Sequence, residues 1–297
     1  MNLVIAGGGV KAYAAIGALK ILEEKMTFDK IAGVSAGSII ASLLAVGCDS
    51  NFIQTLYDEM DLSQYVLKYH SIFTYLKIIY RNGIYDTEDF KNKIIHVLLL
   101  KACNNGDITF EDVFEIYGKT LVISGCSLTK RETHYYHHIS NPDMKIKDAI
   151  AISCCVPFLF RPVIWKNDVL VDGGVIENYP LYFFKDSQIP NSKLTRVVDN
   201  NKELDKNTIG IRFSDNAITE HEKGILNFIK SLIFTFLTNN DRKYIREDYW
   251  EKTIMIEADN VDSVANFNLS KKDKQKLLLA GYYASKDFMV KNLNQLA

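Results

Sequence analysis

The segment that most constrains this chain is Gly33-Val34-Ser35-Ala36-Gly37, which lies between a short apolar strand and a helix rich in Ala, Ile and Leu. A strand, a Gly-x-Ser-x-Gly turn and a helix form the pattern of a nucleophile elbow. We expect Ser35 to adopt unfavourable backbone angles there, because Gly33 and Gly37 remove the Cβ atoms that would clash as the turn closes. Its hydroxyl would then project from the end of a sheet beside the N–H groups of the following helix.

Length and composition predict one large domain. The 297 residues contain no Pro/Gly/Ser-rich linker, which favours a single α/β domain over residues 1–297. A net charge of −1 provides no basic stripe and argues against nucleic acid as a partner. The five cysteines form no Cys-x-x-Cys pair, the start lacks a signal-peptide pattern, and no run of apolar residues is long enough to span a membrane. We therefore expect a cytoplasmic protein in a reducing compartment.

A glycine-rich turn follows the first predicted strand. Residues 2–6 lead into Gly7-Gly8-Gly9-Val10-Lys11-Ala12 and then a helix to about Glu24. Gly7-x-Gly9-x-x-Ala12 satisfies the dinucleotide-binding fingerprint, but the same N–H groups could form an oxyanion hole. The next strand, 28–34, runs into Ser35 instead of ending in the acidic residue that would bind a ribose, which favours the oxyanion hole. A purely structural tight turn is the third interpretation.

The middle of the chain, about residues 51–118, is predicted to be mainly helical, with helix starts at Asp86 and at Thr109. Within it, residues 66–81 interleave aromatic, aliphatic and cationic side chains. This pattern favours a helix packed on the sheet with snorkelling lysines over a membrane-surface or lid helix.

Further along the chain, residues 120–127 and 132–138 are predicted as strands. Three histidines (His134, His137 and His138) lie in the second of these, and we interpret them as part of a solvated strand edge, not a metal site. Residues 146–155 are predicted as a helix. Beyond the hairpin described next, we expect a surface loop over 185–207, strands at 208–213 and 253–257, and helices at 224–237 and from Ser270 to about Asn292.

A predicted hairpin over residues 161–171 delivers Asp172 to the end of its second strand, directly before Gly173 and Gly174. A serine hydroxyl needs a base to accept its proton. In the order serine, acid, histidine, the only histidine after Asp172 is His221, which lies in a charged helix start. The alternative is that Asp172 itself accepts the proton from Ser35, with its basicity raised by partial burial.

Taken together, the Gly7 to Lys11 loop, the Gly33 to Gly37 elbow and Asp172-Gly173-Gly174 with Asn178 and Pro180 resemble the patatin-like phospholipases. The resemblance extends to the Ile16 to Glu24 helix and to Ala151 to Pro157, and it covers nearly the whole chain. It implies a three-layer α/β/α sandwich with a mainly parallel central sheet. Within this domain, residues about 51–118 are predicted as a mainly helical insertion or lid-like region.

The resemblance also implies roles for single residues. Ser35 would be the nucleophile and Asp172 the base of a Ser-Asp dyad, with no metal and no cofactor. The oxyanion hole would come from the loop Gly7, Gly8, Gly9 and Val10, chiefly from Gly8 and Gly9. Lys11 matches the basic position of the family, whereas Ala12 replaces its usual glycine, which predicts a slightly altered turn.

The sequence thus predicts a serine acyl hydrolase of the phospholipase A or lysophospholipase type that acts on lipid esters, with transient contact with membrane surfaces. Two alternatives remain open, a dinucleotide-binding oxidoreductase and a non-catalytic lipid-binding protein of the same fold. Head group, acyl position, chain length and oligomeric state are not predicted.

Overall fold

A computed structural model describes residues 1–60, 62, 72–184, 204–214, 247–258 and 269–292, together with 224, 228, 231, 232 and 235. Its strands are β1 (Asn2–Ile5), β2 (Lys30–Gly33), β3 (Gly83–Tyr85), β4 (Thr120–Ser127), β5 (Glu132–Tyr136), β6 (Phe158–Phe160), β7 (Val163–Trp165), β8 (Asp168–Asp172), β9 (Thr208–Ser214) and β10 (Thr253–Glu257).

The α-helices are α1 (Tyr13–Leu22), α2 (Ala36–Ala45), α3 (Ser50–Glu59), α4 (Ile72–Arg81), α5 (Thr87–Phe90), α6 (His96–Cys103), α7 (Phe110–Tyr117), α8 (Ile146–Ser153), α10 (Glu247–Trp250) and α11 (Lys271–Asn292). Short 3-10 helices cover η1 (Gly9–Ala12), η4 (Gly173–Val175) and η5 (Leu181–Phe184), and the π-helical turn η3 (Lys91–Ile95) joins α5 to α6.

The main sheet has the strand order β10-β9-β1-β2-β4-β8-β7, and β5 pairs with β4. The strands from β10 to β4 are parallel to their neighbours, whereas β5, β7 and β8 pair in antiparallel fashion. Strands β1 and β4 are buried along their whole length. Continuous burial is expected of central parallel strands because helices cover both faces of such a sheet.

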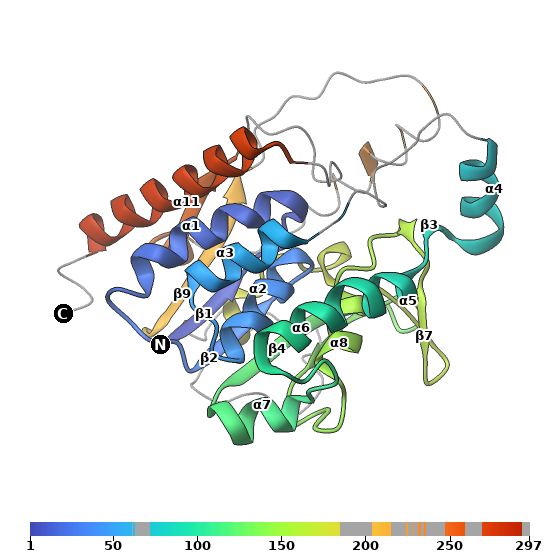
Figure 1. Cartoon of the computed structure of the whole chain (residues 1–297), viewed down its shortest axis with the longest axis horizontal. Coiled ribbons are helices and arrows are strands. Elements are labelled where there is room, and N and C mark those ends of the chain that lie inside the picture. Colours follow the sequence, from blue (N-terminus) through green and yellow to red (C-terminus); the bar gives the residue numbers. More distant parts are fainter. Residues whose placement is uncertain are drawn as a thin grey trace.

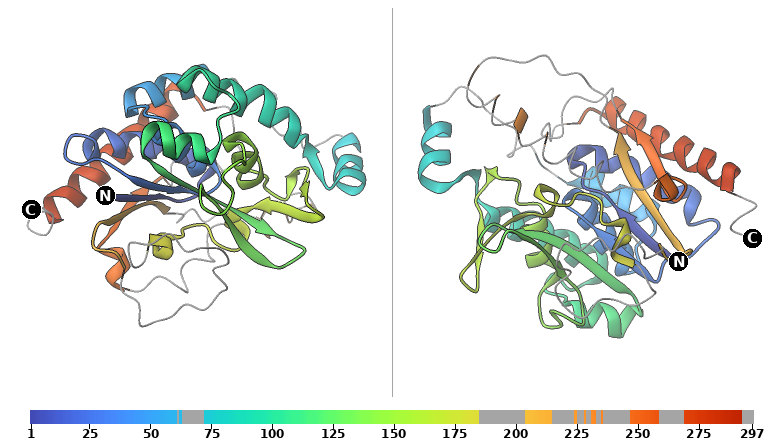
Figure 2. Two further views of the ribbon diagram at one scale, coloured as in Figure 1. Left: turned by 90° about the horizontal axis from the view of Figure 1, so that it is seen from below. Right: turned by 180° about the vertical axis from the view of Figure 1, so that it is seen from behind.

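Side-chain alternation shows what covers each face of the sheet. Gly33 of β2 lies against the first turn of α2, so that face packs under the helical layer. Gly210 of β9 lies on the opposite face, against Tyr179 and Leu181 of the segment that leads into η5. Figure 2 shows α1 and α11 together on one side of the sheet. The predicted α/β class with a mainly parallel central sheet and helices on both sides is confirmed.

The hairpin that carries Asp172 turns as its sequence requires. Strands β7 and β8 are joined by Lys166 and Asn167, which both have positive φ angles, 49° and 62°. Positive φ at both central residues is the geometry of a type I′ turn, whose twist matches the twist of the paired strands. The turn therefore sets a register in which Asp172 is the last residue of β8.

The predicted helix starts at Asp86, Thr109 and Ser270 are confirmed. Asp86 and Ser270 each accept a hydrogen bond from a backbone N–H of the following turn, and Thr109 forms a reciprocal capping box with Asp112. The pair Cys154-Cys155 lies just after α8, not inside it, and all five cysteines are free.

Helix α4 corrects one prediction. We expected residues 66–81 to pack on the sheet, but α4 lies at the periphery, away from the sheet (Figure 1). Ile79 is 69% exposed and Tyr80 is 79% exposed. Residues 72–81 of the predicted segment are helical, whereas residues 66–71 lie outside the described residues. The exposed apolar side chains of α4 are not used for packing within the described part of the chain.

Two further details differ from expectation. Strands β3 and β6 form a separate two-stranded parallel pair, which their length of three residues hid from pattern analysis. Strand β5 ends at Tyr136, so His137 is not part of a solvated strand edge but is buried. Burial lowers the pKa of His137 to about 4, so this histidine is neutral at physiological pH.

The predicted helix at 224–237, nearly all of the loop at 185–207, and His221 lie outside the described residues.

Helices α1 and α11 cross at unusually close range. A methyl group at Gly281 would collide with the carbonyl oxygen of Ala14, and one at Gly17 would collide with that of Leu278. Because both obstacles are backbone atoms, neither helix can yield without moving as a whole.

We therefore predict that Gly281→Ala lowers the free energy of unfolding by about 1–3 kcal/mol, although alanine is the better helix former. The matched control on α11 is Leu279→Ala, which removes a 46% exposed side chain and should change stability by at most about 0.5 kcal/mol. Urea unfolding of both variants measures this. Equal stability of Gly281→Ala and the wild type would contradict the close crossing.

Candidate active site

Ser35 occupies a strained turn between β2 and α2. Its backbone angles are φ 50° and ψ −131°, in a region that side-chain-bearing residues rarely adopt. The strain is sustained by hydrogen bonds on both sides of the residue. Its N–H donates to Ser153 Oγ at 2.8 Å, and its carbonyl accepts from the N–H and the hydroxyl of Ser38. The predicted elbow is therefore present, with Ser35 at the N-cap of α2.

The two glycines of the motif allow backbones to approach closely, as the sequence predicted. A Cβ at Gly33 would lie 2.6 Å from the carbonyl oxygen of Gly37, and a Cβ at Gly37 would lie 2.5 Å from that of Ala6. The second contact was not foreseen, because it joins the elbow to the end of β1. It brings the glycine-rich loop to the side of the serine.

The loop from Gly7 to Val10 lies beside Ser35. A Cβ at Gly7 would be 3.1 Å from Ser35 Cβ. Asn178 fixes this end of the loop with two hydrogen bonds, since its side-chain amide donates to the Gly7 carbonyl at 3.0 Å and its own carbonyl accepts from the Gly7 N–H at 3.1 Å. The Gly7 N–H is thus already used.

The N–H groups of Gly8, Gly9 and Val10 donate to no other group among the described residues outside η1, where first-turn N–H groups have no intrahelical partner. Gly9 has a φ of 53°, which suits glycine. Lys11 and Ala12 follow as buried residues of η1. These three N–H groups remain for a bound oxygen atom.

Sheet register brings Asp172 to the same level as Ser35. Gly33 of β2 pairs with Ile123 of β4, and Gly125, two residues further along β4, pairs with Asp172 of β8. Ser35 likewise follows Gly33 by two residues. The carboxyl end of β2 and the end of β8 therefore lie at the same level, on opposite sides of β4.

Asp172 is completely buried and only partly hydrogen-bonded. Its Oδ1 accepts the Gly174 N–H at 2.8 Å, whereas Oδ2 has no partner of normal hydrogen-bond geometry among the described residues. Burial raises the pKa of Asp172 to about 7, although the nearby Ser35 hydroxyl and the Gly174 N–H oppose that rise. A carboxyl group in this environment binds a proton near neutral pH, as a general base must.

Ser153 is a hydrogen-bond partner of Ser35 that the sequence did not reveal. Its hydroxyl, at the end of α8, accepts the N–H of Ser35. Two residues later, the Cys155 carbonyl accepts the N–H of Asp172 at 2.9 Å. One short segment thus supports both Ser35 and Asp172. Its only signal in the sequence was the Ala151 to Pro157 stretch, to which no role was assigned.

Gly173, next to Asp172, allows the backbone to approach Ser124 of β4 closely. A Cβ there would be 2.5 Å from Ser124 Oγ and 2.8 Å from the Ser124 carbonyl oxygen. The glycine after Asp172 therefore lets η4 begin directly against β4, which keeps the carboxyl group in the sheet layer.

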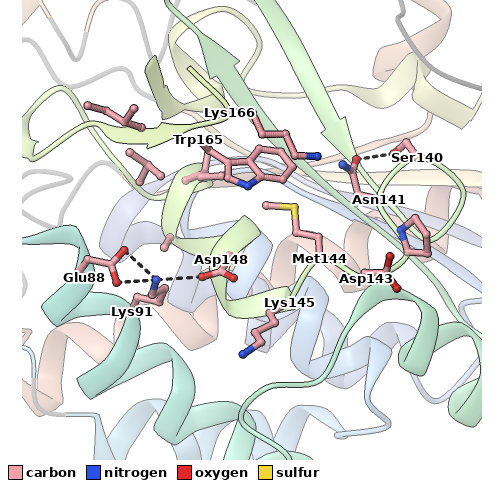
Figure 3. Close-up of a pocket in the computed structure, with 15 residues that line it drawn as sticks. Glu88, Lys91, Ser140, Asn141, Asp143, Met144, Lys145, Asp148, Trp165 and Lys166 are labelled. Carbon is pink, nitrogen blue, oxygen red and sulfur yellow. Dashed lines mark hydrogen bonds and ion pairs between the residues drawn. The ribbon is translucent and has the colours of Figure 1, made fainter. Parts of the chain in front are cut away.

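A pocket of about 500 Å³, lined by both polar and apolar residues, lies beside α8. Figure 3 shows Trp165 and Met144 facing one another across it, and Lys91 held between Glu88 and Asp148. Neither Ser35 nor Asp172 lines this pocket. It is therefore separate from the Ser35 site.

The histidines of the described region are engaged elsewhere: His96 with Lys147, His134 with Glu132, His137 with Phe183 and His138 with Phe114. Among the residues that the structure describes, no three His, Cys, Asp or Glu side chains gather as a metal site would require. None of the described helices is both long and apolar enough to cross a bilayer.

Comparison with known proteins places this fold in a family. The sequence model of the family described as patatin-like phospholipase matches residues 3–185, which is more than half of the chain. The protein therefore belongs to the patatin-like phospholipase family, which the motifs predicted. This family match agrees with the presence of Ser35 after β2, where a dinucleotide-binding fold would have an acidic residue that binds the ribose. It therefore disfavours the interpretation of the glycine-rich loop as a dinucleotide-binding site.

Three of the related sequences come from two viruses and a fungus. Protein R571 of Acanthamoeba polyphaga mimivirus is 29% identical over 99% of this chain and 95% of its own length. A probable lipid hydrolase, 463L of Invertebrate iridescent virus 6, is 30% identical over 61% of each chain. Triacylglycerol lipase ptl3 of Schizosaccharomyces pombe is 27% identical over 66% of this chain and 42% of its own length.

Solved structures show the same fold. VipD from Legionella pneumophila superimposes with a TM-score of 0.60 at 18% identity, over 98% of this chain and 66% of VipD. ExoU in its complex with SpcU from Pseudomonas aeruginosa gives a TM-score of 0.54 at 19% identity, over 99% of this chain and 52% of ExoU. This chain thus spans only part of either protein.

Burial of Asp172 predicts a pH-dependent stability. The folded protein holds the proton up to a pKa of about 7, whereas the unfolded chain releases it near the ordinary value of about 3.9. Between these values the wild type should lose up to about 1.4 kcal/mol of unfolding free energy per pH unit, a slope that Asp172→Asn lacks. The stability advantage of Asp172→Asn should therefore grow from pH 4 to pH 7 and then level off.

Urea unfolding of both proteins at pH 4, 5.5, 7 and 8 measures this difference, because an asparagine can still accept the Gly174 N–H. A difference that is the same at every pH would show that Asp172 has an ordinary pKa.

Proposed function

We propose that this protein is a serine acyl hydrolase that cleaves fatty-acyl esters of phospholipids or lysophospholipids with a Ser35–Asp172 dyad. The observation that supports it most directly is the buried carboxyl group of Asp172, at the end of β8 beside the strained Ser35. Membership in a lipid hydrolase family and the names of two relatives, a probable lipid hydrolase and a triacylglycerol lipase, support the substrate class.

In the acylation step, Asp172 accepts the proton of the Ser35 hydroxyl as Oγ bonds to the ester carbonyl carbon. The carbonyl π electrons move to oxygen, and that oxyanion would be held by the N–H groups of Gly8, Gly9 and Val10. Collapse of the tetrahedral intermediate breaks the ester C–O bond, and the proton on Asp172 passes to the departing alcohol.

Deacylation repeats these steps with water. Asp172 accepts a proton from the water as its oxygen attacks the acyl-enzyme carbonyl, and the proton then returns to Ser35 Oγ as the fatty acid leaves. The sequence of steps uses one base twice and requires no metal or cofactor. By the same proposal the enzyme works in the cytoplasm and meets its substrate at membrane surfaces.

Loss of either dyad residue should abolish hydrolysis. Ser35→Ala and Asp172→Asn should each lower fatty-acid release from a panel of phospholipids, lysophospholipids and triacylglycerol by at least about 10³-fold, measured with EDTA present. The matched control is Asp168→Asn, which changes the same group on the same face of β8, four residues away, where it bonds Ser127. It should retain activity within about tenfold.

A comparable loss in Asp168→Asn would show that the assay reports damage to β8 rather than chemistry. Release of fatty acid by Ser35→Ala at the wild-type rate would contradict the proposal. His221→Ala belongs in the same series, since loss of activity in that variant would indicate a triad.

The pKa of Asp172 also predicts a pH profile. Since only the ionised carboxylate can accept a proton, kcat/KM for an uncharged soluble ester should rise about tenfold per pH unit below pH 7. It should level off above the pKa of about 7. Initial rates between pH 5 and pH 9 test this, and a rate that stays constant down to pH 5 would exclude a base with a raised pKa.

A further inference from the structure

Exposed apolar side chains from three separate segments gather at one end of the molecule. Leu76, Ile79 and Tyr80 lie on α4, Phe158 on β6 and Ile164 on β7, and each is between 40% and 79% exposed. We call these five residues the apolar rim. Figures 1 and 2 show α4, β3 and β7 at the same end of the chain's fold, and β6 pairs directly with β3.

Positive charge accompanies the apolar rim. Residues 72–85 contain Lys77 and Arg81 but no acidic residue, and both cations are exposed. Residues 158–167 likewise contain no acidic residue and end with the exposed Lys166 and Asn167. Among the described residues, Lys77 and Arg81 form no ion pair. Apolar side chains beside lysine and arginine are typical of segments that lie in the headgroup region of an anionic membrane.

Phe158 provides an independent observation. It has a φ of 65°, an unfavourable angle for a bulky residue, yet its side chain is 42% exposed. A strained backbone is maintained when it serves a site. Phe158 follows Cys155, whose carbonyl holds the N–H of Asp172, by only three residues. The chain therefore passes from a backbone contact of Asp172 to the apolar rim within three residues.

A lipid surface suits this region better than a protein partner does. Protein interfaces are depleted of lysine, whereas membrane-binding surfaces combine lysine and arginine with aromatic and aliphatic side chains. We propose that the apolar rim, with Lys77, Arg81 and Lys166, docks on an anionic lipid surface. The choice of a lipid as occupant rests on the proposed function.

The test uses the Ser35→Ala protein, so that hydrolysis cannot alter the vesicles. It should sediment with vesicles of phosphatidylcholine and phosphatidylglycerol, and less with phosphatidylcholine alone. Ile79→Ser with Tyr80→Ser should weaken the binding at least about tenfold, and Lys77→Gln with Arg81→Gln should remove the preference for the anionic vesicles. Ile116→Ser is the matched control, since Ile116 is 67% exposed on α7, and binding should not change.

Circular dichroism confirms that each variant is folded before it is used. Equal vesicle binding by the Ile79→Ser, Tyr80→Ser protein would overturn the proposal, as would no binding of Ser35→Ala to either vesicle. A dimer in solution that these two substitutions dissociate, without vesicle binding, would instead assign the apolar rim to a second copy. Hydrolysis of a soluble short-chain ester by the wild type tests the proposed function separately, because it needs no membrane.

Discussion

The strained turn at Ser35 is the constraint on which the rest of the site depends. A residue with a side chain at φ 50° and ψ −131° is stable only if its surroundings fix it. Here Ser153 binds the N–H and Ser38 binds the carbonyl. Gly37 allows the turn to rest against the end of β1. These contacts together hold the backbone of Ser35 in its strained conformation.

The second requirement of the proposed mechanism is a base whose environment disfavours its charge, the role we propose for Asp172. Asp172 is buried and receives one hydrogen bond from Gly174, which is too little to stabilise a carboxylate fully. Its raised pKa has a cost in stability above pH 4, and we interpret that cost as the condition for proton transfer near neutral pH. Register along β2, β4 and β8 places this base at the level of the serine.

Local patterns in the sequence were sufficient to predict the turn at Ser35 and the hairpin that ends at Asp172. A strand, a glycine-containing turn and a helix occur within a dozen residues around Ser35, and the turn at Lys166 and Asn167 lies inside the hairpin that delivers Asp172. Both are short-range signals. The family resemblance, carried by the ordered motifs, agreed with the family found by comparison.

What the sequence could not show was long-range. The hydrogen bond from Ser35 to Ser153 joins residues 118 positions apart, and the bond from Asn178 to Gly7 joins residues 171 apart. No local pattern marks either one. Helix α4 was misplaced for a different reason, because an amphipathic helix has the same periodicity whether its apolar face meets a sheet or remains exposed.

In the proposed mechanism, Ser35 is a nucleophile that Asp172 activates. The most direct measurement is peptide mass spectrometry after brief exposure to a fluorophosphonate, at pH 8, of the wild type and Asp172→Asn. We expect the phosphonyl adduct on Ser35 of the wild type and a much slower reaction in the variant. Labelling of another serine, or equal labelling of Ser35 in both proteins, would contradict it.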